Sequence, residues 1–362
     1  MTPKARVECV LRGGVGETVP FTMYENKIPQ CVTERLLRNR GLCIVKRDVP
    51  AFKTHRPGVR TTQRVFSENG KKLVETCHET PSGTLTLLEE PLVFTSWTHR
   101  HLFKTPDDYR ALRAFIAAER YEPNYAEFSR AQADFGEDAI FRAGFGLEPL
   151  QALISGQLMD MQTFCMEWME NRDEILKLYA LLVEQRRQVY GLVAESPALI
   201  ANYGGNVVVQ AIGPKVFEQY YLPHYDEAAE VMHRHGKLIG CHFDAHCKQL
   251  SALIARTKLD YIEAFTPTPD TDMTLAEARA AWPDKVLWIN FPSSFHLHEN
   301  AAVERTAVNL LHELDRVDGV IMGITEDMPP ERWQGSCRAI LDGLERHARE
   351  RPEAYRGSAK QA

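Results

Sequence analysis

The sequence predicts an α/β fold, a (β/α)8 TIM barrel with an N-terminal elaboration made of a β-hairpin and helices. Short apolar segments typical of strands alternate with helix-like segments along most of the chain, and the strand-like segments outside the hairpin number eight, as in a barrel. The rival fold is an open, doubly wound sheet. No Gly-x-Gly-x-x-Gly sequence follows any expected strand, so the usual signature of that fold is missing.

The expected barrel strands are short apolar segments rich in β-branched and aromatic residues. A short helix and a turn in residues 1–18 precede the first strand, and a helix over residues 30–38 separates the first strand from the second. The eight strands are expected at residues 19–24, 41–47, 139–146, 199–205, 237–241, 261–265, 286–291 and 319–324.

The alternation is interrupted after the second strand. A Glu68-Asn69-Gly70 turn lies between two stretches of alternating residues, which favours a β-hairpin. We expect this hairpin insertion over residues 60–100. The segment 106–121 that follows has helical periodicity and an acidic first turn.

Helices are expected between the later strands. The segment 172–195 buries one apolar stripe, and the segment 214–235 has a proline at its start. The other helices are expected at residues 148–156, 160–169, 248–256, 275–281, 301–314 and 331–349. Residues 1–350 are therefore expected to form a single barrel domain, and residues 351–362 a polar tail.

Composition excludes several classes of protein. Of the 362 residues, 44% are hydrophobic and 25% are charged, which is typical of a globular protein. A net charge of -6 without a basic run argues against a nucleic-acid partner. The absence of a signal-peptide apolar region or of an 18-residue apolar stretch argues against export and a membrane span, so we expect a cytoplasmic location. Eight cysteines without a Cys-x-x-Cys pair are expected to be thiols.

The segment from Lys237 to Cys247 is the strongest candidate for a functional site. His242 and Asp244 follow a buried strand and, being two residues apart in an extended chain, point to the same side. Both are potential metal ligands, and a metal site formed by them would need a third ligand. The alternative is an ordinary strand-to-helix loop, in which Asp244 caps the helix that begins near Lys248.

In a TIM barrel, the residues that follow the strands form one ring, where the active site lies. The ring would collect Glu25, Asn26, Asn202, Tyr203, Asn206, His242, Asp244, Glu263, Asn290, Thr325, Glu326 and Asp327. The ring contains more carboxylates and amides than the turns after the strands would require. Individual members also have structural explanations: Asn206 as a turn residue after two glycines, Asp327 as a helix cap, and Glu263 as a buried residue bonded across the barrel.

The most economical metal site consists of His242, Asp244 and Glu326 with an open fourth position. Three nitrogen and oxygen ligands with one open position are typical of catalytic zinc. His246 and Cys247 are competing ligands, although their offset from His242 is expected to turn them away.

Several segments resemble the uroporphyrinogen decarboxylase superfamily. The longest runs from Gly204 to His246, and the others are WTHRHLFKTPDDYRAL, ETPSGTLT, DYIEAFTPTPDTDMTLAEARAAW and GITEDMPPERW. The resemblance covers most of the chain and implies a TIM barrel. Decarboxylases of this superfamily carry an arginine-rich N-terminal loop that binds the substrate carboxylates. Here the corresponding stretch MYENKIPQ contains Glu25 and only Lys27, so this activity is disfavoured.

The resemblance instead favours the cobalamin-dependent methyltransferases of the superfamily. Those that act with coenzyme M bind zinc through a His-x-Cys motif and a later cysteine. His242 matches the histidine, Asp244 replaces the first cysteine, and Glu326 lies at or near the place of the second. Carboxylates in place of thiolates make the metal a stronger Lewis acid, which suits an ether or alcohol oxygen.

The resemblance and the site together imply a metal-dependent methyltransferase. It would move a methyl group from a small methylated donor, in the first place an aryl methyl ether (O-demethylation), to the cobalt of a corrinoid protein. Zinc or another divalent metal is expected, and the corrinoid would come from a partner protein because the chain has no Asp-x-His-x-x-Gly motif. The sequence neither predicts nor excludes a homodimer.

Two further roles complete this hypothesis. Glu25 or Tyr203 is expected to donate the proton, and the substrate is expected to contact Asn26, Asn202, Asn206, Asn290 and Phe291. The alternatives are a decarboxylase or lyase of a tetrapyrrole or a smaller carboxylic acid, and a non-catalytic tetrapyrrole or corrinoid binder.

Overall fold

The structure is a computed structural model that describes residues 1–92, 95–205 and 207–356. Contacts between residues divide the chain into two compact units. The first unit consists of Met1–Ala51, Asn124–Gly146 and Val193–Ala362, and the second of Phe52–Pro123 and Leu147–Leu192. The single barrel domain that the sequence predicts over residues 1–350 is not tested by this division and stays a prediction.

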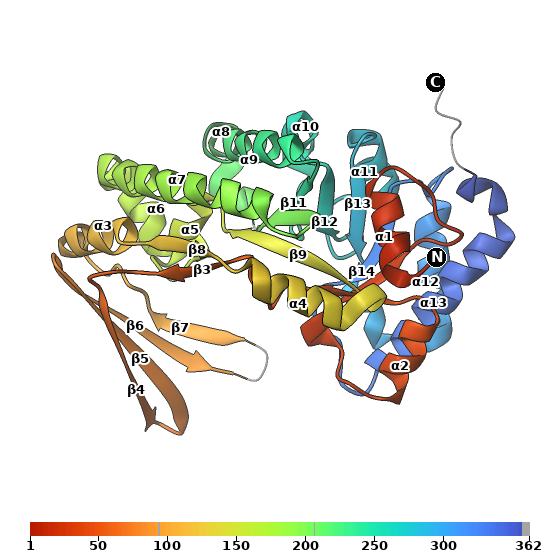
Figure 1. Cartoon of the computed structure of the whole chain (residues 1–362), viewed down its shortest axis with the longest axis horizontal. Coiled ribbons are helices and arrows are strands. Elements are labelled where there is room, and N and C mark those ends of the chain that lie inside the picture. Colours follow the sequence, from red (N-terminus) through yellow and green to blue (C-terminus); the bar gives the residue numbers. More distant parts are fainter. Residues whose placement is uncertain (93–94, 206, 357–362) are drawn as a thin grey trace. The chain divides into compact units, whose positions relative to one another are not determined.

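The first unit contains a closed, parallel, eight-stranded barrel (Figure 1), which confirms the predicted fold class. Each strand lies within, or one residue beyond, a segment that the sequence predicts as a strand. The barrel strands are β1 (Phe21–Tyr24), β2 (Cys43–Lys46), β9 (Ala139–Gly146), β10 (Ile200–Tyr203), β11 (Leu238–His242), β12 (Tyr261–Phe265), β13 (Val286–Asn290) and β14 (Val320–Ile324). They follow one another around the barrel in chain order, and β14 pairs with β1 to close it.

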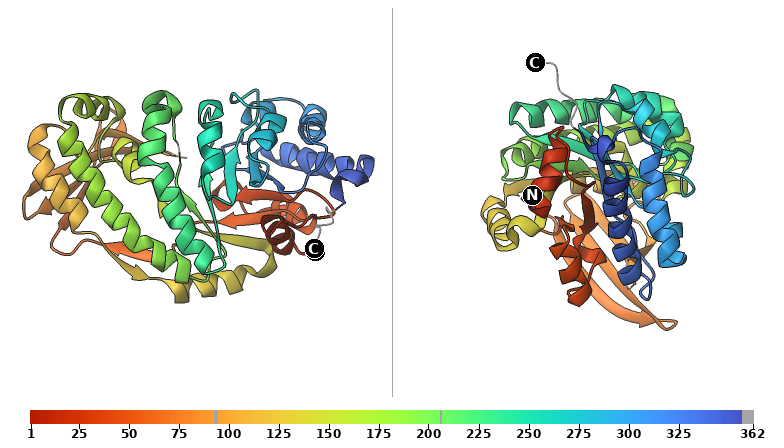
Figure 2. Two further views of the ribbon diagram at one scale, coloured as in Figure 1. Left: turned by 90° about the horizontal axis from the view of Figure 1, so that it is seen from above. Right: turned by 90° about the vertical axis from the view of Figure 1, so that its right-hand side faces the viewer.

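Helices of the first unit connect and cover these strands. They are α1 (Pro3–Leu11), α2 (Val32–Asn39), α4 (Tyr125–Phe135), α8 (Val209–Tyr220), α9 (Leu222–Arg234), α10 (Ser251–Arg256), α11 (Leu275–Ala281), α12 (Asn300–His312) and α13 (Trp333–Glu350). The last two pack side by side (Figure 2). No helix in the described ranges is both long and apolar enough to cross a membrane.

Residues 214–235, predicted as one helix, belong to two. Gly213 has φ 68° and interrupts α8 just before Pro214, where the sequence predicts a helix start. The second helix, α9, has Pro223 in its first turn. Proline is well suited to this position because it has no N–H that would need a partner in the preceding turn.

The barrel interior is filled by apolar side chains at the end opposite the predicted site. Val7 and Val10 of α1 share a buried cluster with residues near the beginnings of strands, such as Ile140 and Ile200. Trp288 lies in the same cluster and donates from Nε1 to Thr22 Oγ1 at 2.8 Å. Because α1 packs where the strands begin, we expect a site at the other end, as is usual for this fold.

The second unit contains two antiparallel sheets. The larger has the strands β4 (Arg60–Glu68), β5 (Lys71–Thr80), β6 (Gly83–Pro91) and β7 (Ser96–Arg100), and the smaller has β3 (Phe52–His55) and β8 (Arg120–Pro123). The predicted hairpin is β4–β5, and its turn residues Asn69 and Gly70 have φ 52° and 76°. Positive φ at both positions is the requirement of a type I′ turn, which explains the Asn-Gly pair.

The helices of the second unit match the prediction closely. They are α3 (Tyr109–Ala117), α5 (Pro149–Ser155), α6 (Met161–Glu170) and α7 (Arg172–Glu195), whose last residues belong to the first unit. Strands β6 and β7, which extend the predicted hairpin to a four-stranded sheet, were not predicted from the sequence. Neither were strands β3 and β8 and helix α4. The strands are mostly polar, and α4 buries only Phe128, so neither gives a clear apolar pattern.

Candidate metal centre

His242, Asp244 and Glu326 come together at the mouth of the barrel. One ligand atom from each lies within 4.8 Å of the others. His242 ends β11, and Asp244 follows it by two residues, whereas Glu326 follows the end of β14. These strands are not neighbours, so the closed barrel brings the three side chains together. In the described part of the chain, no other three His, Cys, Asp or Glu residues form such a group.

The two ring nitrogens of His242 have different surroundings. Nδ1 lies 2.7 Å from Glu263 Oε2, and Nε2 lies 3.4 Å from Asp244 Oδ2. Strand register explains the first contact, because His242 of β11 is paired with Glu263 of β12. A carboxylate that accepts from one ring nitrogen fixes the tautomer and leaves the other nitrogen for a metal. Nε2 is therefore the nitrogen that can bind an ion together with Asp244.

Glu263 is fully buried and receives several donors. Arg142 Nη1 lies 2.6 Å from its Oε1, and Tyr24 also donates to Oε1. Asn202 Nδ2 donates to Oε2 at 3.2 Å. Burial raises the pKa of Glu263, but the charges of Arg142 and His242 outweigh burial and lower it to about 2. Glu263 is therefore a permanent carboxylate behind His242.

The backbone of β12 is irregular next to Glu263. The residue after Glu263, Ala264, has φ 60°, and the register between β12 and β13 shifts at this point. A bulge redirects the side chains next to it and is common near functional sites.

The competing metal ligands lie apart from the group. Cys247 Sγ is buried at 3.9 Å from Met273 Sδ, and burial raises the pKa of this thiol to about 12. His246 is exposed, with Nδ1 at 3.9 Å from Asp272. The structure therefore places neither residue with His242.

Glu25 and Asn26, a predicted catalytic and a predicted substrate-binding residue, both bind Arg47. Glu25 accepts from Arg47 at 3.2 and 3.3 Å, and Asn26 Oδ1 accepts at 3.0 Å. The same guanidinium lies over the ring of Tyr24, 3.4 Å from its centroid. Proton donation by Glu25 stays a prediction, and the structure adds that its carboxylate is ion-paired.

The predicted residues of β10 point to opposite sides. Asn202 reaches Glu263, whereas Tyr203 is fully buried against the rings of Phe145 and of Tyr225 in α9. The structure thus brings Asn202 but not Tyr203 to the His242 group. Asn206, also predicted to bind substrate, lies outside the described residues.

Asn290 and Phe291 follow the same alternation at the end of β13. Asn290 Oδ1 accepts from the backbone N–H of Thr325 at 2.9 Å, and its Nδ2 donates to Thr266 Oγ1 at 3.2 Å. It therefore fixes the backbone next to Glu326. Phe291 is fully buried and packs against the rings of Phe295 and His296.

Sequence reasoning missed two residues of the site, Tyr24 and Arg142. The signal for Arg142 was available, because an arginine in the otherwise apolar strand β9 must find a buried partner. Tyr24, the last residue of β1, carried no such signal.

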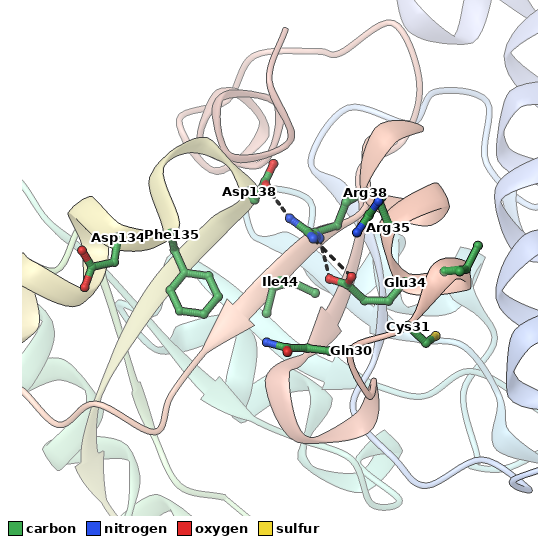
Figure 3. Close-up of a pocket in the computed structure, with 10 residues that line it drawn as sticks. Gln30, Cys31, Glu34, Arg35, Arg38, Ile44, Asp134, Phe135 and Asp138 are labelled. Carbon is green, nitrogen blue, oxygen red and sulfur yellow. Dashed lines mark hydrogen bonds and ion pairs between the residues drawn. The ribbon is translucent and has the colours of Figure 1, made fainter.

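The outer surface of the barrel carries a separate cavity of about 650 Å³ (Figure 3). It is lined mainly by residues of the Gln30–Arg38 segment and by Asp134, Phe135 and Asp138. Arg38 in this cavity is ion-paired with Glu34 and with Asp138, the latter at 2.6 Å. None of the predicted site residues lines it, so the barrel mouth remains the candidate site.

Comparisons with known proteins support the fold. No model of a protein family matches the sequence, and no curated protein matches it either. Among solved structures, a methyltransferase from Methanosarcina mazei superposes with a TM-score of 0.58 at 9% identity, over 96% of this chain and 99% of that one. At this identity, the likeness shows a shared fold along nearly the whole chain.

A second solved structure, the IOLI protein with a bound zinc atom, matches 64% of this chain and 84% of its own at 9% identity. Its TM-score is 0.34, which is too low to support an argument.

Proposed function

We propose that the chain is a metal-dependent methyltransferase that moves a methyl group from a small methylated donor to the cobalt of a corrinoid protein. The observation that carries the proposal is the grouping of His242, Asp244 and Glu326 at the barrel mouth. The resemblance of the sequence to the uroporphyrinogen decarboxylase superfamily and the shared fold with the Methanosarcina methyltransferase support it.

The donor set fits a divalent metal such as zinc. It offers one imidazole nitrogen and two carboxylates, and the buried Glu263 orients the imidazole. When bound, the metal would act as a Lewis acid toward the oxygen that leaves the methyl group. Asp244 is only partly buried and Glu326 is exposed, so the group is open to a substrate from the solvent side.

An aryl methyl ether is the favoured donor. Its methyl group passes to cobalt, which as Co(I) supplies the electron pair of the new bond, and the ether oxygen keeps the electrons of the broken bond. A phenol has a pKa of about 10, so its anion leaves more readily than that of an alcohol. A phenolate can leave with little help from a proton donor. This favours an aryl ether, because Glu25, one of the expected proton donors, is ion-paired with Arg47.

The first test is the metal content of the purified protein. We expect about one zinc per chain in the wild type and none in His242→Ala. His246→Ala is the matched control, because His246 is exposed and lies apart from the group. Equal metal content in wild type and His242→Ala would overturn the metal site.

The second test is the reaction. The zinc-loaded protein is mixed with cob(I)alamin and a methoxylated aromatic compound, and methylcobalamin is followed by absorbance. We expect it to form with the wild type and not with His242→Ala. If the zinc-loaded wild type formed none with any methoxylated aromatic compound, the aryl ether proposal would be wrong even with the metal site intact.

A further inference from the structure

The second unit contains two neighbouring cavities that the methyl-transfer proposal does not use. Their volumes are about 140 and 320 Å³. They share four lining residues, Arg56, Phe115, Gly156 and Leu158. Together they reach the size of a small-molecule site.

The smaller cavity has more positive than negative groups. Arg56, between β3 and β4, pairs with Glu119 at 2.7 Å, and Tyr121 donates to the same carboxylate at 2.9 Å. Arg186 of α7 also lines the cavity, but in the described ranges it makes no hydrogen bond or ion pair that would neutralise it. Two guanidinium groups therefore face one carboxylate.

Both arginines also have an unused buried donor. The Nε atoms of Arg56 and Arg186 are buried and have no acceptor among the described residues. Buried polar atoms without partners are rare in folded proteins. A guanidinium presents its N–H groups in a plane that matches two oxygens of a carboxylate or phosphate, so the missing acceptor is best supplied by an oxyanion.

The sheet lines the larger cavity with uncharged polar groups and with one carboxylate, that of Glu89, which accepts a hydrogen bond from Gln157 at 2.6 Å. Thr61 bonds His78 at 2.9 Å, and Gln63 donates to Thr76 at 3.1 Å. Burial, together with the charge of nearby Arg56, lowers the pKa of His78, which keeps the imidazole neutral. These groups can contact the uncharged part of a ligand.

The lining also includes the ring of Phe115 and a residue with positive φ, Gln157. The ring of Phe115 lies 4.2 Å from the Arg56 guanidinium and 4.7 Å from the His78 ring. Gln157 has φ 67° and is held by a 2.6 Å hydrogen bond to Glu89. A positive φ in a residue other than glycine often marks a binding site.

We propose that these cavities bind a small organic molecule with one oxyanion group, a carboxylate or a phosphate, between Arg56 and Arg186. The uncharged polar part of the molecule lies along the sheet, near Thr61 and His78. None of the lining residues belongs to the His242 group, and the proposal does not depend on methyl transfer.

The test is calorimetric titration of the full chain with inorganic phosphate and, separately, with benzoate. We expect saturable binding of at least one probe and about tenfold or greater weakening in Arg186→Gln, since charge-assisted hydrogen bonds are lost. Arg187→Gln is the matched control, because it removes the same charge from an exposed residue outside the cavity. An unchanged circular dichroism spectrum and an unchanged urea midpoint of Arg186→Gln would show that the variant is folded.

The two probes separate the two oxyanions. Binding of phosphate alone assigns a phosphate ligand, and binding of benzoate alone assigns a carboxylate. No binding of either up to about 10 mM, which corresponds to a negligible affinity, overturns the proposal. Equal weakening in Arg186→Gln and Arg187→Gln also overturns it, since the effect would then be one of general charge.

Discussion

Glu263 determines which nitrogen of His242 is available to a metal. The carboxylate accepts from Nδ1, and Arg142 on its other oxygen keeps it charged inside the barrel. The three residues come from the neighbouring strands β11 and β12 and from β9, so the register of the barrel fixes their contact. The candidate metal centre thus depends on a residue that does not bind the ion.

Glu263→Gln tests this dependence. The amide fills the same space but has no charge to balance buried Arg142, so we expect the free energy of unfolding to fall by about 3–5 kcal/mol. Zinc affinity is expected to fall roughly 10- to 100-fold, because His242 loses its anionic partner. Urea unfolding and zinc titration measure the two effects.

The control for this prediction is the double variant Glu263→Gln/Arg142→Met. Removing the unpaired charge is expected to restore part of the stability but none of the zinc affinity. Recovery of both, or of neither, would contradict the roles given to the two residues.

His296 makes stability depend on pH. Its imidazole is buried next to Ser336, and burial lowers its pKa to about 4, against an ordinary value of about 6.5. Protonation therefore favours the unfolded chain. The stabilisation that the neutral His296 contributes to folding is therefore complete above about pH 6.5 and is lost as the pH falls toward 4.

From pH 7 to pH 5 we expect the wild type to lose about 2 kcal/mol more unfolding free energy than His296→Gln, which has no titrating group. Urea unfolding of both proteins at the two pH values measures the difference. Identical pH dependence in the two proteins would show that His296 does not titrate as described.

At the scale of the elements, the end of β10 and the end of β11 are in contact through a glycine. Gly205 has φ 85°, and a Cβ there would lie 1.9 Å from the carbonyl oxygen of His242. Gly205→Ala must therefore displace the backbone of a proposed metal ligand. We expect it to lower the free energy of unfolding by more than about 2 kcal/mol and to remove bound zinc.

Gly236→Ala is the control for this prediction. Gly236 also has a positive φ, 68°, but a Cβ there would meet no atom within 4 Å. The variant is expected to lose only about 1 kcal/mol, the cost of a left-handed alanine, and to keep its zinc. Zinc loss in both variants, or in neither, would argue against the contact at Gly205.

The elements also show what the sequence could predict. All eight barrel strands were predicted, because a buried strand is a local run of apolar residues. Strands β3 and β8 were missed, because they are mostly polar and pair with each other across a long stretch of chain. The break between α8 and α9 was missed because the apolar pattern continues across it.

The same limit applies to the site. His242, Asp244 and Glu326 follow strand ends, so the barrel rule alone brings them to one ring. Which side of a strand a residue faces depends on the barrel register, which no local pattern gives. The strand-end rule therefore predicts Tyr203, which packs against Tyr225 of α9, and gives no reason to predict Tyr24, which donates to Glu263.

At the scale of the whole molecule, the proposed metal links distant parts of the barrel. His242 and Asp244 follow one strand and Glu326 follows another three positions away around the barrel. Such a site exists only when the barrel is closed. A metal bound there must therefore stabilise the folded chain by mass action, since an ion that binds only the folded state shifts the equilibrium toward it.

Free zinc at 100 times its dissociation constant is expected to raise the free energy of unfolding by about 2.7 kcal/mol. This increase should disappear with a chelator and be absent in Glu326→Ala. Asp327→Ala is the control and should keep the increase, because Asp327 is paired with Lys27 and is not in the group. Thermal unfolding with and without zinc measures it. If zinc stabilised Glu326→Ala as much as the wild type, His242 and Asp244 alone would hold the ion, and the metal would not link the two strands.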